Sequence, residues 1–260
     1  MRLAVAATAP FGADVLERLA GAHEIEYVLT RPDAPRGRGR KLAPPPAKEA
    51  AARLGVRVLQ PERPELPGEP VDAIVVCAYG LLIPQTLLDE ALWLNVHPSL
   101  LPRWRGAAPV ERAIMAGDTD TGGSIIRLVE ELDAGPIGAQ EPFPIGEDDA
   151  GEVYRRAAEV AARLLDPLPQ EFVAQAEEGM TYADKITAAD RVLDLSRPAE
   201  ELVRRVRALS PHIGARAELQ GRPVTVWRAR VGEDGGFEPL EVQPESGRRM
   251  DYAAWLRGLR

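Results

Sequence analysis

Three polar side chains in two segments of the sequence could act together on an acyl group. Asn95 and His97 stand two residues apart in NVHPSLLPRWRG, at the end of an apolar run typical of a buried strand. On a regular strand both side chains point to the same face. An amide beside an imidazole can stabilise an oxyanion, and a carboxylate can set the protonation of the imidazole. Asp133, in the turn ELDAGP, is the candidate carboxylate, although the sequence does not fix its distance from His97.

Each of these features also has a purely structural interpretation. A single histidine at a strand end is more often a packing residue, and Asp before Gly is usually turn chemistry. The run GRGRK could be a basic loop that binds nothing. From the residues alone we therefore predict only an α/β enzyme that handles an anionic ligand.

The order of apolar and amphipathic segments predicts the scaffold that positions these residues. Strands are expected at 2–7, 24–30, 72–80 and 91–97, with helical segments between them. This alternation predicts a doubly wound, mostly parallel α/β sheet of the Rossmann-like class, with right-handed crossovers. Such sheets bind ligands beyond the carboxyl ends of their strands, where AYG and NVH should meet.

The second half of the chain changes character near residue 176. The segment TGGSIIRLVEELDAGPIGAQEPFPI predicts two strands around a turn, and a long helix is expected over about 150–175. The polar segment 176–190 lacks periodicity and is expected to be a linker. Short alternating strands with GR and DGG turns then predict a small β-rich domain. We therefore expect a catalytic domain at 1–175, the linker at 176–190 and a C-terminal domain at 191–260.

Charge is unevenly distributed along the chain. The formal net charge of the 260 residues is −8, which argues against a general nucleic-acid coat protein. However, residues 31–41 carry five positive groups and one negative group, and residues 201–260 carry 11 Lys/Arg against 8 Asp/Glu. An acidic body with basic patches predicts a localised contact with a polyanion.

Composition also limits the environment of the protein. The only cysteine, Cys77, cannot form an internal disulfide, which is typical of the reducing cytoplasm. The sequence has no run of about eighteen apolar residues, so we predict no membrane-spanning helix. Three scattered histidines and one cysteine have no metal-ligand spacing, so we expect no metal.

The stretch NVHPSLLPRWRGAAPVERAIMAGDTDTGGSIIRLVEELDAGPI closely resembles the core of the folate-dependent formyltransferases. The Asn, the His, the SLLP turn, the RG and the late LDAG stand in the same order and at matching spacing. Members of this family transfer a formyl group from 10-formyltetrahydrofolate to an amine. The resemblance implies that Asn95 and His97 stabilise the oxyanion that forms when the amine attacks the formyl carbon. It also implies that Asp133 orients His97 and helps to remove the proton of the amine through water.

The same resemblance implies a folate site at the edge of the sheet. The SLLP turn would shape one side, the AYG end of a strand the floor, and the two leucines after it would lie near the pterin. EDDAG at 147–151 resembles a loop that closes over the pterin in this family. The residues expected to bind folate are Tyr79, Gly80, Leu81, Leu82, Ser99, Leu100, Leu101, Pro102, Asp148 and Asp149.

The basic segment RPDAPRGRGRKLAPPPAK resembles the tRNA-binding loop of those family members that formylate methionyl-tRNA. TYADKI resembles their linker motif, and GRPVTVWRAR resembles the start of their OB-like C-terminal domain. The resemblance implies initiator methionyl-tRNA as the acceptor, with Arg36, Arg38, Arg40 and Lys41 as contacts and Arg38 as the principal one. Arginines and lysine on such a loop can approach phosphates closely. We expect the enzyme to be a monomer.

The chain departs from the family pattern in three places. Ala7 stands where a glycine is frequent, and His212 stands where an aromatic is frequent. Several strands are missing before VQPESGRRM, so we expect a shortened OB-like domain with too few strands to close a five-stranded barrel. Two alternatives stay open, namely an N-formyltransferase acting on an amino sugar nucleotide and a catalytically idle tRNA-binding homologue.

Overall fold

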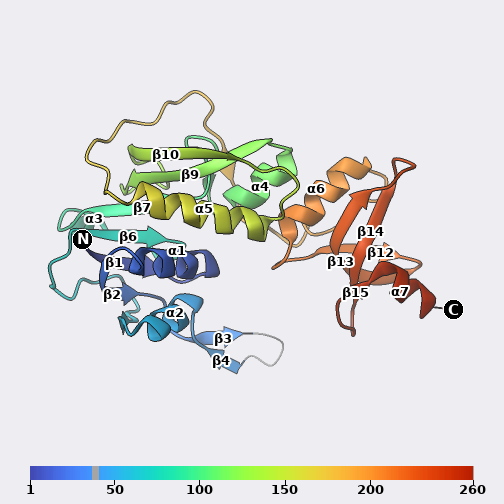
Figure 1. Cartoon of the computed structure of the whole chain (residues 1–260), viewed down its shortest axis with the longest axis horizontal. Helices are drawn as coiled ribbons and strands as arrows, with labels where there is room; N and C mark the ends of the chain where they lie inside the picture. Colours follow the sequence, from blue (N-terminus) through green and yellow to red (C-terminus); the bar gives the residue numbers. More distant parts are fainter. Residues whose placement is uncertain (37–40, 260) are drawn as a thin grey trace. The chain divides into compact units, whose positions relative to one another are not determined.

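The computed structural model describes residues 1–36 and 41–259 (Figure 1). The chain forms two compact units, each assembled from segments that are not continuous in the sequence. Unit 1 comprises Met1–Arg105, Gly122–Pro142 and Arg155–Thr181, and unit 2 comprises Gly106–Thr121, Phe143–Tyr154 and Tyr182–Arg260. No helix among the described residues combines the length and the apolar character needed to cross a bilayer.

The main sheet has seven strands in the order β10-β9-β7-β6-β1-β2-β5. The strands are β1 (Arg2–Ala7), β2 (Glu24–Leu29), β5 (Arg57–Leu59), β6 (Ala73–Cys77), β7 (Trp93–His97), β9 (Asp120–Arg127) and β10 (Ile137–Pro144). The first five of these pair in parallel, and β9 runs antiparallel to β7. This arrangement confirms the predicted doubly wound, mostly parallel sheet.

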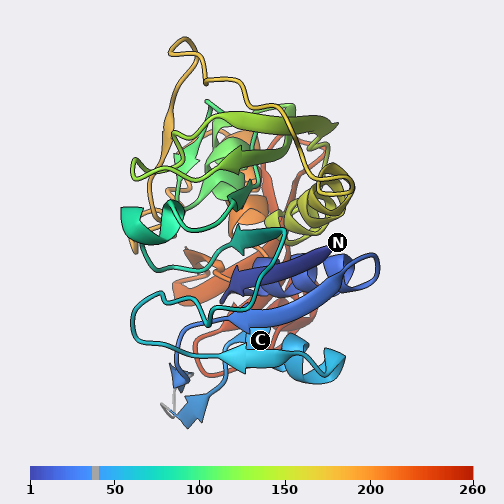
Figure 2. The same ribbon diagram turned by 90° about the vertical axis from the view of Figure 1, so that its left-hand side faces the viewer.

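Three helices cover one face of the main sheet (Figures 1 and 2). The helices of unit 1 and its boundary are α1 (Pro10–Ala20), α2 (Pro46–Leu54), α3 (Gln85–Leu88) and α5 (Ala150–Leu164). Because side chains alternate along a strand, Leu3 and Val5 face one core cluster and Ala4 and Ala6 face another. The first cluster includes residues of α1, α2 and α5, so these three helices pack on the same face of β1.

Local sequence explains where these helices begin and end. Pro10 opens α1, where its fixed φ suits a first turn and its missing N–H has no helical partner to lose. Gly12 lies so close to β6 that a Cβ there would overlap the carbonyl oxygen of Cys77. The helix predicted over 150–175 is wrong beyond Leu164, where α5 ends, because Pro167 and Pro169 cannot continue it.

Unit 2 contains a four-stranded antiparallel sheet in the order β12-β13-β14-β15. Its elements are α4 (Pro109–Ala116), α6 (Ala199–Leu209), β12 (Ala215–Leu219), β13 (Arg222–Val231), β14 (Phe237–Pro244), β15 (Met250–Asp251) and α7 (Tyr252–Arg257). The alternating ARAEL of β12 buries Ala215, Ala217 and Leu219 against a core that includes Trp255. The order ends at β12 and β15. This sheet therefore has four strands, in keeping with the few strands that the shortened sequence predicts.

The later part of the segment predicted to be a linker, residues 184–190, is hydrogen-bonded to α4 within unit 2. Arg112 of α4 donates to Asp190 Oδ1 at 2.8 Å and to the carbonyl oxygens of Asp184 and Lys185. Asp190 also accepts from the backbone N–H of Thr187 at 2.8 Å. The hydrogen bond from Arg112 holds the pKa of Asp190 well below its usual value. Of the two short strands nearby in the sequence, β8 (Arg105–Gly106) precedes α4 and β11 (Tyr182–Ala183) lies within the segment 176–190.

Between β2 and α2 the chain forms a short hairpin from β3 (Ala34–Arg36) and β4 (Lys41–Ala43). The two strands form a two-stranded sheet of their own. The predicted tRNA contacts Arg38 and Arg40 lie outside the described residues.

Candidate active site

Asn95, His97 and Asp133 come together at the carboxyl end of β7. The Asn95 amide donates to Asp133 Oδ1 at 3.1 Å, and His97 Nδ1 lies 3.6 Å from Asp133 Oδ2. All three side chains are nearly buried. One carboxylate therefore faces both the amide and the imidazole, which is the juxtaposition that the sequence left open.

The antiparallel strand β9 makes this meeting possible. Its register places Ser124 opposite His97 and Ile126 opposite Asn95. The chain then leaves β9 and turns back through Asp133 toward β10. Asp133 is thus brought to the end of β7 by strand pairing, over a separation of 38 residues from Asn95.

The two imidazole nitrogens of His97 have different surroundings. Nε2 lies 2.8 Å from the carbonyl oxygen of Trp104. Since a carbonyl only accepts hydrogen bonds, this contact assigns a hydrogen to Nε2. Nδ1 faces Asp133, so it is the ring position at which a second proton would be held beside a carboxylate.

Two polar side chains form hydrogen bonds that fix the SLLP turn after β7. The Ser124 hydroxyl donates to the carbonyl of Ser99 at 2.6 Å and accepts from the N–H of Leu101 at 3.2 Å. Gln140 Nε2 donates to the carbonyl of Leu101 and to Ser124, both at 2.8 Å. Ser124 and Gln140 were not predicted as site residues. The signal for Ser124 is its place in a run of small residues, TGGS, on a strand next to the turn.

The turn that carries Asp133 contains a residue with a positive φ and a glycine that lies close to the backbone of a neighbouring strand. Asp133 has a φ of +50°, which is unusual for a non-glycine residue. A Cβ at Gly135 would overlap the carbonyl oxygen of Arg127. The glycine of LDAG is therefore required by the space available and not only by turn chemistry.

Gln175 holds this turn from a distant part of the chain. Its Nε2 donates to the carbonyl oxygens of Asp133 and Gly135, both at 2.7 Å. Its Oε1 accepts from Nε and Nη2 of the buried Arg105 at 3.0 and 2.8 Å. Sequence reasoning missed Gln175, because it lies in the segment that was interpreted as the end of a helix.

A Gln175→Leu substitution should lower kcat about tenfold, because two carbonyls of the Asp133 turn lose their donor. Steady-state kinetics with both substrates would measure the effect, with KM for the formyl donor expected to change little. Gln170→Leu is a matched control, since Gln170 donates only to the carbonyl of Leu168 in the same segment. An unchanged kcat in Gln175→Leu, or an equal loss in Gln170→Leu, would show that Gln175 does not position Asp133.

The residues expected at the folate floor lie at the carboxyl end of β6. The Tyr79 side chain packs in the core cluster with Tyr27 and Trp93, and burial raises its pKa. Its carbonyl oxygen accepts from the Thr8 hydroxyl at 2.7 Å, which ties β6 to the end of β1. Gly80 has a φ of +81°, a value that favours glycine. The structure therefore places the backbone of this turn, and not the Tyr79 ring, at the edge of the sheet.

The other expected folate residues divide between the two units. Ser99 and Leu101 are buried in unit 1, while Leu82 is 79% exposed. Asp148 and Asp149 belong to unit 2. There the carbonyl of Asp148 accepts from Arg207, and Asp149 Oδ1 accepts from the N–H of Glu152 at 3.0 Å, in the first turn of α5.

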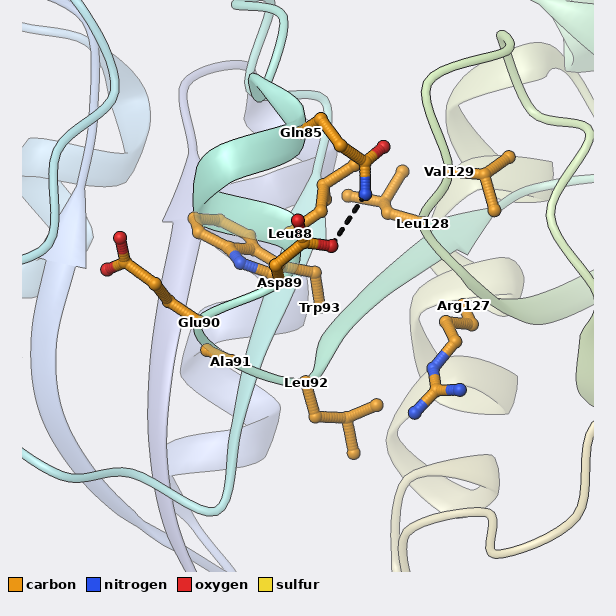
Figure 3. A pocket seen from close by; sticks show the side chains of 10 residues that line it. All are labelled: Gln85, Leu88, Asp89, Glu90, Ala91, Leu92, Trp93, Arg127, Leu128 and Val129. Atoms are coloured by element: carbon orange, nitrogen blue, oxygen red, sulfur yellow. Dashed lines mark hydrogen bonds between the residues drawn. The ribbon is translucent and has the colours of Figure 1, made fainter.

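A pocket of about 480 Å³ lies at the opposite end of β7 (Figure 3). It is lined by Gln85, Leu88, Asp89, Glu90, Ala91, Leu92, Trp93, Arg127, Leu128 and Val129. Gln85 donates to Asp89 Oδ1 at 2.7 Å across its upper side. Trp93 begins β7 and His97 ends it, so this pocket is separate from the cluster of Asn95, His97 and Asp133.

Arg36 and Lys41 are the predicted tRNA contacts that lie among the described residues. Lys41 is exposed in β4 and pairs across the hairpin with Arg36 of β3. Within 1–36 and 41–259, no cluster of three or more His, Cys, Asp or Glu side chains could hold a metal ion.

Two family models match the sequence. The model described as formyl transferase matches residues 1–166, and the model described as formyl transferase, C-terminal domain, matches residues 185–239. The methionyl-tRNA formyltransferase of Alcanivorax borkumensis is 44% identical over 95% of this chain and 79% of its own length.

Solved structures share the fold at lower sequence identity. The methionyl-tRNA formyltransferase from Clostridium thermocellum matches with a TM-score of 0.64 at 15% identity, over 96% of this chain and 99% of that chain. HypX from Aquifex aeolicus, solved in complex with tetrahydrofolic acid, matches with a TM-score of 0.66 at 18% identity. That match covers 98% of this chain and 46% of HypX, so the chain spans about half of the length of HypX.

Proposed function

The chain belongs to the methionyl-tRNA formyltransferase family, and from this membership we propose that it formylates methionine on charged initiator tRNA, with 10-formyltetrahydrofolate as the donor. The observation that carries the proposal is the meeting of Asn95, His97 and Asp133 around one carboxylate at the carboxyl edge of the sheet. Donor and acceptor are both substrates, and we propose a cytoplasmic monomer with the domain division 1–175, 176–190 and 191–260.

Formyl transfer begins when the α-amine of methionine attacks the formyl carbon of the donor. The formyl oxygen then gains negative charge. Asn95 gives one N–H to Asp133 and has a second with which to face this oxyanion. The Nε2 hydrogen of His97 is bonded to the Trp104 carbonyl and its Nδ1 faces Asp133, so we assign to this fixed, nearly buried ring an electrostatic role beside the oxyanion. Such preorganised polar groups stabilise the charge that develops in the transition state.

The second half of the reaction is a proton transfer and the loss of the folate nitrogen. The attacking amine must lose one proton, and we assign its removal to the Asp133 carboxylate, acting through water. The bond between the formyl carbon and N10 of the folate then breaks, and N10 takes up a proton. The products are formyl-methionyl-tRNA and tetrahydrofolate, so atoms and charge balance without any further reactant.

We assign the binding of the two substrates to separate regions of the chain. The turn from Ser99 to Pro102 and the backbone at Gly80, both in unit 1, are proposed to bind the folate. HypX, which shares this fold, was solved with tetrahydrofolic acid. The basic segment 31–41, with Arg36, Arg38, Arg40 and Lys41, is proposed to bind phosphates of the tRNA. The 44% identity with the methionyl-tRNA formyltransferase of Alcanivorax borkumensis favours methionyl-tRNA over an amino sugar nucleotide as the acceptor.

Replacing Arg38 by alanine should lower kcat/KM for methionyl-tRNA by about 10- to 100-fold, as expected for the loss of a hydrogen bond between charged groups. The rate of formyl-methionine formation would be measured at several tRNA concentrations. Arg63→Ala is the matched control, because Arg63 is an exposed arginine outside the hairpin. Equal rates for the wild type and Arg38→Ala would remove Arg38 from the interface. A wild type that formylates no methionyl-tRNA would contradict the proposed function.

A further inference from the structure

Three elements of unit 1 converge on one carboxylate at the base of the basic hairpin. Asp33 stands directly before β3, Lys48 lies on α2, and Gln60 follows β5. Lys48 Nζ lies 2.8 Å from Asp33 Oδ1 and 3.0 Å from Oδ2, and Gln60 Nε2 donates to Oδ1 at 2.8 Å. Gln60 Nε2 also donates to the carbonyl oxygen of Arg31 at 2.8 Å. These contacts fix both the side chain and the backbone where the chain leaves the main sheet.

The hairpin needs such an attachment, because its strands form a sheet of their own. The pairs Ala34↔Ala43, Pro35↔Leu42 and Arg36↔Lys41 are the whole of its described ladder. An isolated two-stranded hairpin is marginally stable in water. Its direction relative to the main sheet of unit 1 is therefore set largely at its two ends. Asp33 is at one end, and the prolines that lead into α2 are at the other.

The contacts around Asp33 are better suited to fixing direction than to adding global stability. The Lys48 and Asp33 side chains are 33% and 29% exposed, and a partly exposed ion pair contributes little to folding. A carboxylate that accepts three short contacts is nevertheless held in one geometry. The hydrogen bond from Lys48, followed by that from Gln60, lowers the pKa of Asp33, so the carboxylate stays charged near neutral pH.

Lys48 also differs from Lys41 in having its charge paired with a carboxylate. Lys41 is exposed in β4, whereas the ammonium of Lys48 is bonded to Asp33. An unpaired carboxylate at the base of a phosphate-binding hairpin would repel its ligand. Lys48 compensates that charge, so the geometry can be kept without an electrostatic penalty.

We propose that Asp33, Lys48 and Gln60 are positioning residues that hold the basic hairpin in the direction needed to bind tRNA. The proposal rests on the proposed function, because it assigns the hairpin to the acceptor substrate. It predicts an effect on the tRNA step alone. The formyl donor should bind equally well whether or not the Asp33 contacts are present.

The Asp33→Asn variant gives the sharpest test, because charge and geometry predict opposite signs. If Asp33 acted only through its charge, its neutralisation would improve binding of a polyanion. If it positions the hairpin, kcat/KM for methionyl-tRNA should fall about tenfold, since charge-assisted hydrogen bonds are lost. The kcat at saturating tRNA and the KM for 10-formyltetrahydrofolate should stay near the wild-type values.

Glu62→Gln is the matched control, because it removes an exposed negative charge two residues from Gln60. It should leave kcat/KM for methionyl-tRNA unchanged or raise it slightly, since a negative charge is removed near a polyanion. Lys48→Met should lower kcat/KM for methionyl-tRNA as Asp33→Asn does. The double variant Asp33→Asn/Lys48→Met should have a kcat/KM no lower than that of either single variant, because the same interaction is lost in all three. Lys48→Arg, which can keep the ion pair, should retain most of the wild-type efficiency.

Two different failures can be told apart. If the wild type formylates methionyl-tRNA and Asp33→Asn is equal or better, the positioning role is wrong and the proposed function stands. Additive losses in the double variant would also overturn the positioning role. If the wild type does not formylate methionyl-tRNA, the proposed function itself fails, whatever the variants do.

Discussion

A His97→Ala variant is expected to form formyl-methionyl-tRNA about 100- to 1,000-fold more slowly than the wild type, the range for removal of a preorganised group that stabilises an oxyanion. The structure gives the reason. The His97 ring is held between the Trp104 carbonyl at 2.8 Å and Asp133 at 3.6 Å, so it has one orientation from which to face the reacting carbon. The loss should appear in kcat, because the ring acts on charge that develops during the reaction.

The control for His97→Ala is a second histidine outside the cluster. His212→Ala changes an exposed histidine of unit 2 and should leave kcat near the wild-type value. The unfolding midpoint of each variant should be measured as well, because His97 is nearly buried and its truncation removes packing. A folded His97→Ala enzyme with normal kcat would show that the imidazole does not act in the reaction.

Replacing Asp133 by asparagine should lower kcat by about 100- to 10,000-fold, the range for loss of a general base. The substitution keeps the size of the side chain and leaves an oxygen that can still accept from the Asn95 amide. It removes the negative charge beside His97 Nδ1 and the group proposed to receive the proton of the amine. The KM values for both substrates should change little, because the overall geometry of the turn is retained.

Asp89→Asn provides the matched change at a carboxylate of the opposite pocket (Figure 3). Kinetics should be measured across a range of pH, since a variant without its base should recover some rate as the amine loses its proton in solution. Equal kcat values for Asp133→Asn and the wild type would assign the proton transfer to another group. A loss of the same size in Asp89→Asn would mean that the effect is not specific to the site.

The sequence predicted the parts of the site that depend on short-range geometry. Asn95 and His97 share a face because they are two residues apart on a strand, and the parallel order of β1, β6 and β7 follows from the alternation of strands and helices. The SLLP turn could also be placed, because it directly follows β7. These features require only the period of a strand and the topology of a doubly wound sheet.

The long-range contacts could not be predicted in the same way. The approach of Asp133 to Asn95 depends on the antiparallel register of β9 and β7. The contribution of Gln175 depends on how the chain continues after α5, and the sequence pattern extended this helix too far. A hydrogen-bonding side chain in an irregular segment has no periodicity by which it could be recognised.

In the C-terminal part, the strands were predicted from the sequence but the hydrogen bonds of the preceding segment were not. Its short alternating strands and the missing segment predicted few strands, and the structure has four in one antiparallel sheet. The bonds from Arg112 to the segment around Asp190 were not predicted, because a polar segment without periodicity resembles a linker. Such a segment can still be fixed when a single arginine satisfies several of its acceptors.

A competition between two acceptors would show directly which one the wild-type protein formylates. Purified protein, 10-formyltetrahydrofolate, methionine-charged initiator tRNA and an amino sugar nucleotide would be incubated together, and both formylated products would be quantified. Formyl-methionyl-tRNA is the expected product, with no formylated sugar above the background without enzyme. Formylation of the sugar nucleotide, with the methionyl-tRNA left unchanged, would contradict the proposed function.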